Sequence, residues 1–453
     1  MPGGVTGAPS GGGKLFRTER FRRRVIDVER IRREPAAVEA NLARRRNPEY
    51  LSLLAAAREK DAAWRVALQQ ADGYRRERNE LGKRIAQARN AGGATDALEA
   101  DGKRLLEAVK RAEASEKEHG ADRDALLRRL PNLLDESVPF GKDDTENVVV
   151  ATWGEPLPPD PARRPHAEVL EALGMADFDR ARRASGAGFY YLTGPVVLLD
   201  LALQRFALDL LIERGFTPVA PPYMLRREPY EGVTDLADFE NVMYKIDGED
   251  LYLIATSEHP LAAMRMGEIL DEESLPIRLV GLSMNFRKEI GGHGVDQKGI
   301  FRVHQFSKVE QFVFCRPEES PTIHEEIRAN AEEVFRRLEI PYRVVNVCTG
   351  DVGTVAAKKY DIEAWFPRQQ AYREVVSCSN CTDYQARRLG IRTGKAGKPG
   401  KVVPHTLNST AVATSRALAV ILEQYQRPDG GVVVPPVLRS YLGGRASIDP
   451  PAH

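Results

Sequence analysis

The stretch from Phe286 to Glu310 has the residue types and spacing that most clearly indicate chemistry. It contains Phe286-Arg287-Lys288-Glu289, a glycine-rich interval over 290–299, and a segment from Arg302 to Glu310. This pattern predicts two strands joined as a long hairpin with a flexible, cationic tip. Alternation along the second strand would place five side chains on one face: Arg302, His304, Phe306, Lys308 and Glu310. Cations, a ring and a carboxylate on one face suit a ligand with phosphates, a flat base and an ammonium group.

Three other segments contribute to the same interpretation. Gly215 to Met224 is proline-rich, and since proline cannot donate to a ladder, we expect a strand there at a sheet edge or interface. Asn408-Ser409-Thr410 is expected to lead into a helix with Arg416 on its first turns, which would form an anion site. In Thr256-Ser257-Glu258, a hydroxyl and a carboxylate two residues apart on an extended segment would face the same way.

Together these segments resemble motifs 1, 2 and 3 of the class II aminoacyl-tRNA synthetases. Motif 2 is matched by Phe-Arg-x-Glu at 286–289 and Arg-x-x-x-Phe-x-x-x-Glu at 302–310, and motif 1 by Gly-Phe-x-x-Val-x-x-Pro from Gly215. Within the class, Thr256-Ser257-Glu258 and Val376-Ser377-Cys378-Ser379-Asn380-Cys381 look like the seryl-tRNA synthetase family. The resemblance covers about Val25 to Gly443, and Asn-Ser-Thr at 408–410 is more similar to archaeal and eukaryotic members than to the common bacterial pattern.

The resemblance implies a two-step reaction. The serine carboxylate would attack the α-phosphate of ATP to give seryl-adenylate and pyrophosphate, and serine would then pass to the terminal ribose of tRNA(Ser), and also of tRNA(Sec). No protein nucleophile is needed, because positioning and charge neutralisation would provide the catalysis. Arg287 would contact the α-phosphate and the serine carboxylate, Arg416 the γ-phosphate, and Glu374 would hold Mg²⁺ with Ser377.

The implied binding residues form two sets, and in them Phe306 would stack on the base and Glu289 would lie on the adenine side. The residues expected at serine are Thr256, Ser257, Glu258, Arg287, Glu310, Asn408 and Thr410. The residues expected at ATP are Arg287, Lys288, Glu289, Arg302, Val303, Phe306, Glu374, Val375, Val376, Ser377 and Arg416.

The N-terminal part must position an RNA partner if the resemblance holds. From Pro35 to Leu130 the chain is almost free of proline, with apolar residues at helical spacing and one break at Ala91-Gly92-Gly93-Ala94. This predicts an antiparallel helical hairpin with arms of roughly 40 residues, or about 60 Å. Residues 1–130 hold 29 Lys and Arg against 20 Asp and Glu, which suits a polyanion. The family's arm grips the long variable arm of tRNA, for which the expected residues here are Arg75, Arg76, Arg78, Lys83 and Arg84.

The texture of the chain changes after Pro131. Strand-like runs near 217–220, 251–255, 277–285, 301–315 and 341–347 are linked mostly by hairpins, which predicts an α+β fold with a mainly antiparallel sheet flanked by helices. Motif 1 further implies a homodimer. The predicted division is a disordered tail at 1–24, the arm at 25–135, a connection at 136–165, a class II catalytic domain at 166–445 and a tail at 446–453.

Composition limits the cellular setting and the metal content. Four cysteines in 453 residues favour a reducing cytoplasm, no secretory signal is evident, and charged residues interrupt the most apolar stretch, Val196 to Ile212, so no membrane span is expected. Cys378-x-x-Cys381 lacks a second pair, so no structural zinc is expected and buried thiols are favoured. At the hairpin tip, His293 is favoured as an exposed side chain over a contact with the tRNA acceptor end.

Three alternatives stay open beside this interpretation. A specialised second copy, serving antibiotic resistance or biosynthesis, would have the same chemistry. A ligase that charges a carrier protein is disfavoured, because such relatives lack the helical arm. A non-catalytic paralogue would have lost Arg287, Glu310, Glu374 or Arg416, and all four are present.

Overall fold

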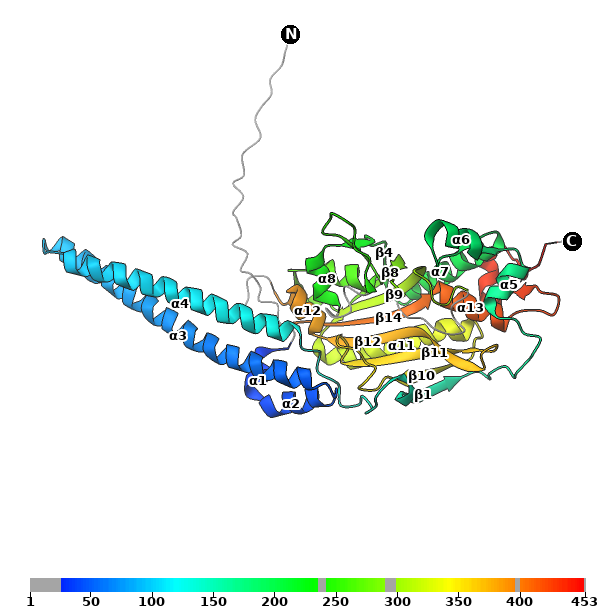
Figure 1. Cartoon of the computed structure of the whole chain (residues 1–453), viewed down its shortest axis with the longest axis horizontal. Coiled ribbons are helices and arrows are strands. Elements are labelled where there is room, and N and C mark those ends of the chain that lie inside the picture. The colour runs from blue at the N-terminus through cyan, green and yellow to red at the C-terminus, as the bar shows by residue number, and fades with distance from the viewer. Residues whose placement is uncertain (1–25, 235–241, 290–298, 396–399, 452–453) are drawn as a thin grey trace, which may run out of the picture.

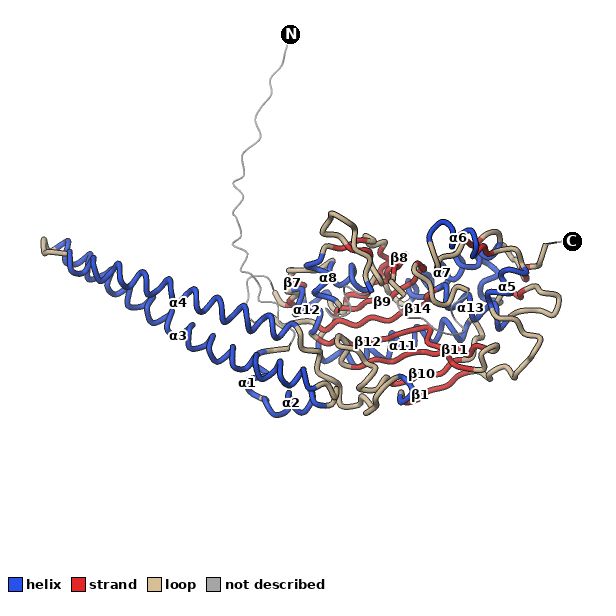
Figure 2. Tube along the Cα trace, in the orientation of Figure 1, coloured by secondary structure: helices blue, strands red, loops and turns tan. Residues whose placement is uncertain are grey.

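The protein consists of a long helical arm and a broad body built around one large sheet (Figure 1, Figure 2). The computed structural model describes residues 26–234, 242–289, 299–395 and 400–451. The predicted tail at 1–24 and the hairpin tip with Ile290, His293 and Gln297 lie outside the described residues.

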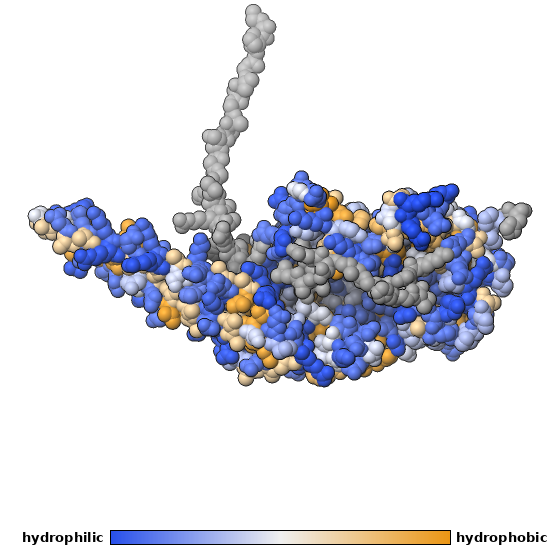
Figure 3. Space-filling model, viewed as in Figure 1, coloured by the Kyte–Doolittle hydropathy of each residue, from blue (hydrophilic) through white to orange (hydrophobic). Residues whose placement is uncertain are grey.

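The arm is the predicted antiparallel hairpin. Its helices are α3 (Pro48–Asn90, 43 residues) and α4 (Asp96–Arg128, 33 residues). At 1.5 Å per residue, α3 is about 64 Å long. The side chains buried along the seam beyond the root are small or medium-sized: Ala67 and Ala71 on α3 and Val109 and Ala112 on α4. The outer arm is mostly hydrophilic on the face shown in Figure 3, so the hairpin is held by a thin apolar seam and by ion pairs.

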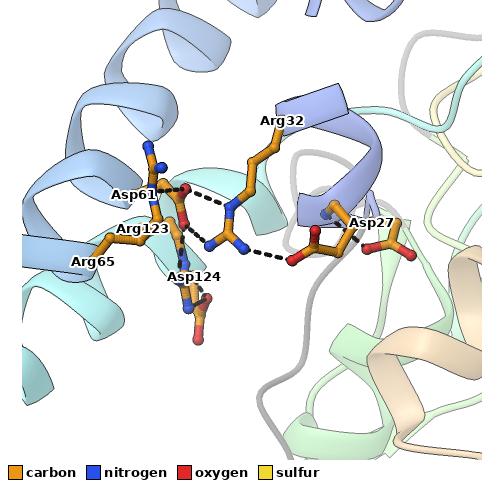
Figure 4. Close-up of polar contacts among 7 residues, drawn as sticks. Asp27, Arg32, Asp61, Arg65, Arg123 and Asp124 are labelled. Carbon is orange, nitrogen blue, oxygen red and sulfur yellow. Dashed lines mark hydrogen bonds and ion pairs between the residues drawn. The ribbon is translucent and has the colours of Figure 1, made fainter. Parts of the chain in front are cut away.

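A buried ionic network closes the arm at its root (Figure 4). Asp61 of α3 accepts hydrogen bonds from Arg32 of α1 (Val28–Arg33) at 2.7 and 2.8 Å and from Arg123 of α4 at 3.1 Å. The Arg123 guanidinium is fully buried, pairs with Asp124 at 2.9 Å and lies 4.5 Å from the Trp64 ring. Burial opposes ionisation of Asp61, but the two arginines outweigh it and lower its pKa. The network therefore joins three helices at one point, next to α2 (Pro35–Ala43).

The body contains one eight-stranded sheet with the strand order β1-β10-β11-β12-β14-β9-β8-β4. All neighbours are antiparallel except β4 and β8, which confirms the mainly antiparallel prediction. The proline-containing strand β4 lies at an edge, as expected. The strands are β1 (Val148–Trp153), β4 (Thr217–Val219), β8 (Ile277–Phe286), β9 (Gln305–Cys315), β10 (Tyr342–Asn346), β11 (Lys358–Phe366), β12 (Ala371–Thr382) and β14 (His405–Ala413).

Two of the predicted element assignments are wrong. β9 begins at Gln305 and not at residue 301, so Arg302 and His304 precede the strand. Asn408-Ser409-Thr410 lies inside β14, and the following helix α13 (Thr414–Gln424) has Arg416 on its first turn, as predicted. Glu258 is the first residue of helix α10 (Glu258–Ala263), so the segment 256–258 is not an extended strand. Strands β11 and β14 and helix α11 (Ser320–Arg337) were not among the predicted elements.

The side chains of β9 alternate between the two faces of the sheet, and the two faces have different surroundings. Val309 and Val313 pack into a large core with α7 (Pro195–Glu213), α11 and α13. Phe312 and Phe314 point the other way, into a second core with the short helices α8 (Arg227–Val233), α10 and α12 (Tyr384–Leu389). Lys308 and Glu310, four and two residues before Phe312, lie on this second face, which therefore carries polar groups at one end and packed rings at the other.

The remaining elements are short and lie around the sheet. They are α5 (His166–Ala172), β2 (Ala176–Asp177), α6 (Phe178–Ser185), β3 (Tyr191–Leu192), β5 (Met224–Leu225), β6 (Tyr252–Leu253), β7 (Ile269–Leu270), β13 (Arg392–Thr393), β15 (Val432–Val433) and β16 (Ser447–Ile448), with 3₁₀ turns at Asp144–Glu146, Glu272–Ser274, Pro317–Glu319 and Pro436–Leu442. Among the helices of the described ranges, none is both long and apolar enough to span a bilayer.

Candidate active site

A cavity of about 340 Å³ lies over the polar part of the second sheet face. Strands β9, β12 and β14 and helix α13 supply most of its walls, so residues far apart in sequence meet there. Its lining residues are Thr256, Glu258, Arg287, Glu289, Phe301, Val303, Phe306, Lys308, Glu310, Lys359, Glu374, Val375, Ser377, Ser379, Asn408, Thr410, Ala413, Ser415 and Arg416. The structure thus brings together most of the residues expected at serine and ATP.

Four expected residues lie outside this lining. The Ser257 hydroxyl is buried against the Gly281 carbonyl, and Val376 belongs to the large core on the opposite side of the sheet. The Lys288 ammonium lies 5.9 Å from the Tyr244 ring. Arg302 is exposed in the loop before β9, where strand alternation does not apply.

One end of the cavity holds a compact, buried polar cluster. The Lys308 ammonium lies 2.7 Å from Glu310 Oε2 and donates to Thr256 Oγ1 at 2.7 Å. Glu310 Oε2 also accepts from the Thr410 hydroxyl at 3.0 Å. Burial lowers the pKa of Lys308, although Glu310 opposes that shift. Lys308 was not among the expected binding residues, yet its alternation with Phe306 and Glu310 was a signal that could have identified it.

Glu258 is the second carboxylate at this end. Its backbone N–H donates to Thr256 Oγ1 at 3.2 Å, so the turn into α10, and not an extended segment, places both side chains at the cavity. Gln385 donates to Glu258 Oε1 at 2.7 Å. Burial, followed by the nearby Glu310 charge, raises the pKa of Glu258 to about 7.

The other end is cationic. Arg416, on the first turn of α13, donates to the Glu374 carbonyl at 2.9 Å and to Glu374 Oε1 at 3.2 Å. Arg287 donates to the Ala255 carbonyl at 3.3 Å, and its guanidinium lies 5.4 Å from the Phe306 ring. Burial and the positive charge of Arg416 lower the pKa of Arg287. Two guanidinium groups that repel each other in a buried site are suited to share an anionic ligand.

A further cation reaches this end from β11, one of the two strands that were not predicted. Lys359 of β11 lies 3.2 Å from Asp361, and burial raises the pKa of Asp361 to about 7 against the attraction of Lys359. Burial would also raise the pKa of Glu374, but Arg416 and Lys359 outweigh it and the pKa is lowered. Glu374 is therefore a carboxylate held ionised among cations, beside the Ser377 hydroxyl.

The cations expected on the arm are partly engaged with the arm itself. Arg75 pairs with Asp72 at 2.8 Å and reaches across to Glu113 of α4 at 3.0 Å. Lys83 pairs with Glu80 at 2.8 Å, and Arg76 donates to the Asp72 carbonyl at 3.3 Å. All are solvent-accessible along the outer half of α3, so the hairpin presents cations while using one of them to hold its two helices together.

Comparison with known proteins defines the class first. Residues 242–425 match the model of the tRNA synthetase class II core domain (G, H, P, S and T), the region that contains most of the cavity lining. The fold and the site are therefore those of a class II aminoacyl-tRNA synthetase. Residues 25–134 match the seryl-tRNA synthetase N-terminal domain, which is the arm.

Relatives and solved structures give the family. The serine–tRNA ligase of Methanocella arvoryzae is 56% identical over 421 residues, which is 93% of this chain and 99% of that protein. The seryl-tRNA synthetase of Pyrococcus horikoshii, solved in complex with ATP, superposes with a TM-score of 0.89 at 48% identity, covering 94% of this chain and 100% of that one. The cytoplasmic enzyme of Naegleria fowleri, in complex with AMP, has a TM-score of 0.84 at 37% identity, with 92% and 96% covered. This chain belongs to the seryl-tRNA synthetase family.

Proposed function

We propose that this protein activates L-serine with ATP and transfers the serine to the 3′ end of tRNA(Ser), with tRNA(Sec) as a second acceptor. The observation that carries the proposal is one cavity with a buried carboxylate cluster at one end and two arginines at the other, attached to a helical arm. The ATP complex of the Pyrococcus horikoshii relative supports the nucleotide assignment.

Serine is assigned to the end that holds Thr256, Glu258, Glu310 and Thr410. Its ammonium group needs a carboxylate, and its hydroxyl needs an acceptor, both of which Glu310 can supply. Lys308 lies 2.7 Å from Glu310 and holds the Thr256 oxygen in place. Asn408 also lines this end, and its amide donates to Cys381 Sγ at 3.5 Å, which leaves its oxygen side for the ligand.

ATP is assigned to the cationic end. Arg287 of the cationic end donates to the carbonyl of Ala255, which precedes Thr256 of the serine end. Arg287 would therefore contact both the serine carboxylate and the α-phosphate, while Arg416 takes the γ-phosphate. Phe306 would stack on the base beside Glu289 and Val303, with Val375 in the wall. Glu374 and Ser377 are oxygen ligands of the kind Mg²⁺ prefers, and they would hold an ion that neutralises phosphate charge. Within the described ranges no three His, Cys, Asp or Glu side chains cluster around a metal position. In nucleotide sites Mg²⁺ is usually bound by one or two carboxylates together with substrate phosphates.

These positions produce catalysis without a protein nucleophile. The serine carboxylate oxygen attacks the α-phosphorus as the bond to the bridging oxygen of the β-phosphate breaks, and pyrophosphate leaves with that electron pair. Arg287 stabilises the charge that develops on the α-phosphate, and Arg416 holds the leaving group in line. The tRNA ribose hydroxyl then attacks the serine carbonyl and releases AMP.

Serine binding is expected to weaken in acid. Below about pH 7 the Glu258 carboxyl becomes neutral and no longer attracts the serine ammonium. The charged groups that face Glu258 are Glu310, Lys308 and Arg287, and burial lowers the pKa of Lys308 and of Arg287. We therefore expect the KM for serine in pyrophosphate exchange to rise as the pH falls from about 8 to about 6, by up to about tenfold per unit below the pKa. Glu258→Gln should have a high KM that lacks this limb; a serine KM that does not vary with pH in the unmodified protein would contradict the assignment.

The arm is assigned to tRNA, and the body to a dimer. Outward-facing cations along α3 suit shape and backbone recognition of folded RNA. The edge strand β4 with α7, which presents exposed Leu198 and Leu201, suits pairing with a second copy as motif 1 implies. Four buried free cysteines are consistent with a protein that acts in a reducing cytoplasm.

Replacing Arg75, Arg76 and Arg78 with alanine is expected to weaken aminoacylation and spare adenylate formation. Loss of three cations should raise the KM for tRNA by about tenfold to a hundredfold at low salt, and by a smaller factor at higher salt, because the variant has fewer cation–phosphate contacts for salt to weaken. Pyrophosphate exchange, which needs no tRNA, should be unchanged. Because Arg75 also ties α3 to Glu113, the pair Arg76→Ala and Arg78→Ala separates lost tRNA contacts from a loosened arm. Arg336→Ala with Arg337→Ala on α11 is the control; an equal fall of both activities in the arm variant would contradict the prediction.

The proposed function is tested by aminoacylation of purified tRNA with each amino acid in turn, with and without a serine-adenylate mimic. We expect charging with serine alone, inhibited by the mimic. Charging of a carrier protein in place of tRNA would favour the ligase alternative, which the presence of the arm disfavours. A second-copy role would leave the chemistry unchanged and would appear as resistance to the mimic.

A further inference from the structure

The short helix α12 lies between the arm root and the serine end of the cavity. Its second residue, Gln385, is fully buried and makes hydrogen bonds to three separate segments. It reaches Glu258 at the start of α10, the Val233 carbonyl at the end of α8, and Thr406 in β14. Gln385 itself does not line the cavity, so it acts on a ligand only through Glu258.

The partners of Gln385 determine the direction of its amide. The Thr406 hydroxyl donates to Oε1 at 2.8 Å, and the Val233 carbonyl, which can only accept, lies 3.2 Å from Nε2. The amide nitrogen therefore faces Glu258, and donates to its Oε1 at 2.7 Å. This bond favours the ionised carboxylate and leaves Oε2 available to a ligand.

Helix α12 is also tied to the root of the arm. Arg388 donates to the Arg128 carbonyl at the end of α4 at 2.8 Å and to the Thr234 carbonyl at 3.0 Å. Tyr384 packs in the arm-root core with Leu54 and Leu127. With these contacts on either side of Gln385, α12 is a rigid support, and little conformational entropy remains to be lost when Glu258 engages a ligand.

We propose that Gln385 is a positioning residue for serine: it holds the Glu258 carboxylate in the orientation that meets the serine ammonium. The proposal rests on the assignment of serine to this end of the cavity. The competing explanation is a structural one, in which Gln385 only satisfies the buried Val233 carbonyl and Thr406 hydroxyl. The two differ in what they predict for serine and for ATP.

The test is Gln385→Met, which keeps the size of the side chain and removes the amide. Loss of a hydrogen bond to a charged group is expected to raise the KM for serine in pyrophosphate exchange about tenfold. The KM for ATP and kcat at saturating serine should stay within about twofold, because the ATP end is not touched. If the role of Gln385 is purely structural, the variant should instead have a lower kcat and a lower active fraction, whichever of the two substrates is varied.

The matched control is Gln311→Met. Gln311 is equally buried, but it lies on the opposite face of the sheet, which α11 covers. There its amide donates to the Ile327 carbonyl at 2.9 Å and accepts from Asn330 at 2.8 Å. Its loss should affect thermal stability and leave the serine KM unchanged. An unchanged serine KM in folded Gln385→Met, or an equal change in both variants, overturns the proposal.

A second variant covers the case in which Gln385→Met does not fold. Thr406→Val removes only the hydroxyl that orients the Gln385 amide. We expect its serine KM to rise about threefold with ATP unaffected, and an unchanged value in the folded variant overturns the proposal. Absence of serine-dependent exchange in the unmodified protein would instead refute the proposed function, so the two failures are distinguishable.

Discussion

Glu310→Ala is expected to abolish serine-dependent pyrophosphate exchange. The change removes the acceptor of the Thr410 hydroxyl and the partner of the buried Lys308 ammonium. Removing one member of a buried ion pair costs about 3–5 kcal/mol. Here the removed carboxylate is also a group that would bind serine. We therefore expect kcat/KM for serine to fall by at least about 10³-fold.

The loss should belong to the site and not to the fold. Glu363→Ala is the control, because Glu363 of β11 pairs with Arg343 of the neighbouring strand β10 and does not line the cavity. Thermal melting and the binding of ATP alone would show whether the Glu310 variant keeps its structure. Near-normal exchange in Glu310→Ala would refute the assignment of this end to serine.

Arg287→Lys is expected to lower exchange by about 10²- to 10³-fold, although the charge is kept. Arg287 of the cationic end donates to the Ala255 carbonyl beside Thr256, and only a planar guanidinium can offer separate N–H groups to two ligands at once. A lysine has one compact ammonium, and in this buried position its pKa would be lowered by burial and by Arg416, as that of Arg287 already is. The effect should appear mainly in kcat, since the interaction grows as charge develops on the α-phosphate.

The measurement is exchange kinetics with both substrates varied, with Arg336→Lys as the control. Arg336 donates to the Tyr342 hydroxyl on the far side of α11 and has no contact with the cavity. If Arg287→Lys changes only the KM for ATP, then Arg287 binds the ground state and does not stabilise the transition state.

The outer architecture was predictable because local rules decide it. Helical spacing from Pro35 to Leu130 and the glycine pair at 92–93 indicate the hairpin, and proline in 215–224 indicates the edge strand. The division of the sheet was less predictable, since β11 and β14 alternate weakly and are buried on both faces. Lys359, the cation from β11, could not be expected before its strand was known.

The misplaced residues share a physical cause. Arg302, Ser257 and Val376 were expected at the ligands from the family resemblance. A strand that starts four residues later, a helix that starts at Glu258 and a core on the other face direct their side chains away from the cavity. A period tells which residues share a face only once the element's ends are known.

Composition and spacing along the chain were enough to indicate the residue types of the site, the helical arm and the family resemblance. The groups that hold the Glu258 and Glu310 carboxylates in place could be identified only from the folded structure. Lys308 bonds Glu310 and Thr256, and Gln385 bonds Glu258 from a helix more than a hundred residues away in the chain. Such contacts arise from the packing of distant segments around a buried cavity, where each polar group must find a partner, and no local pattern specifies that partner.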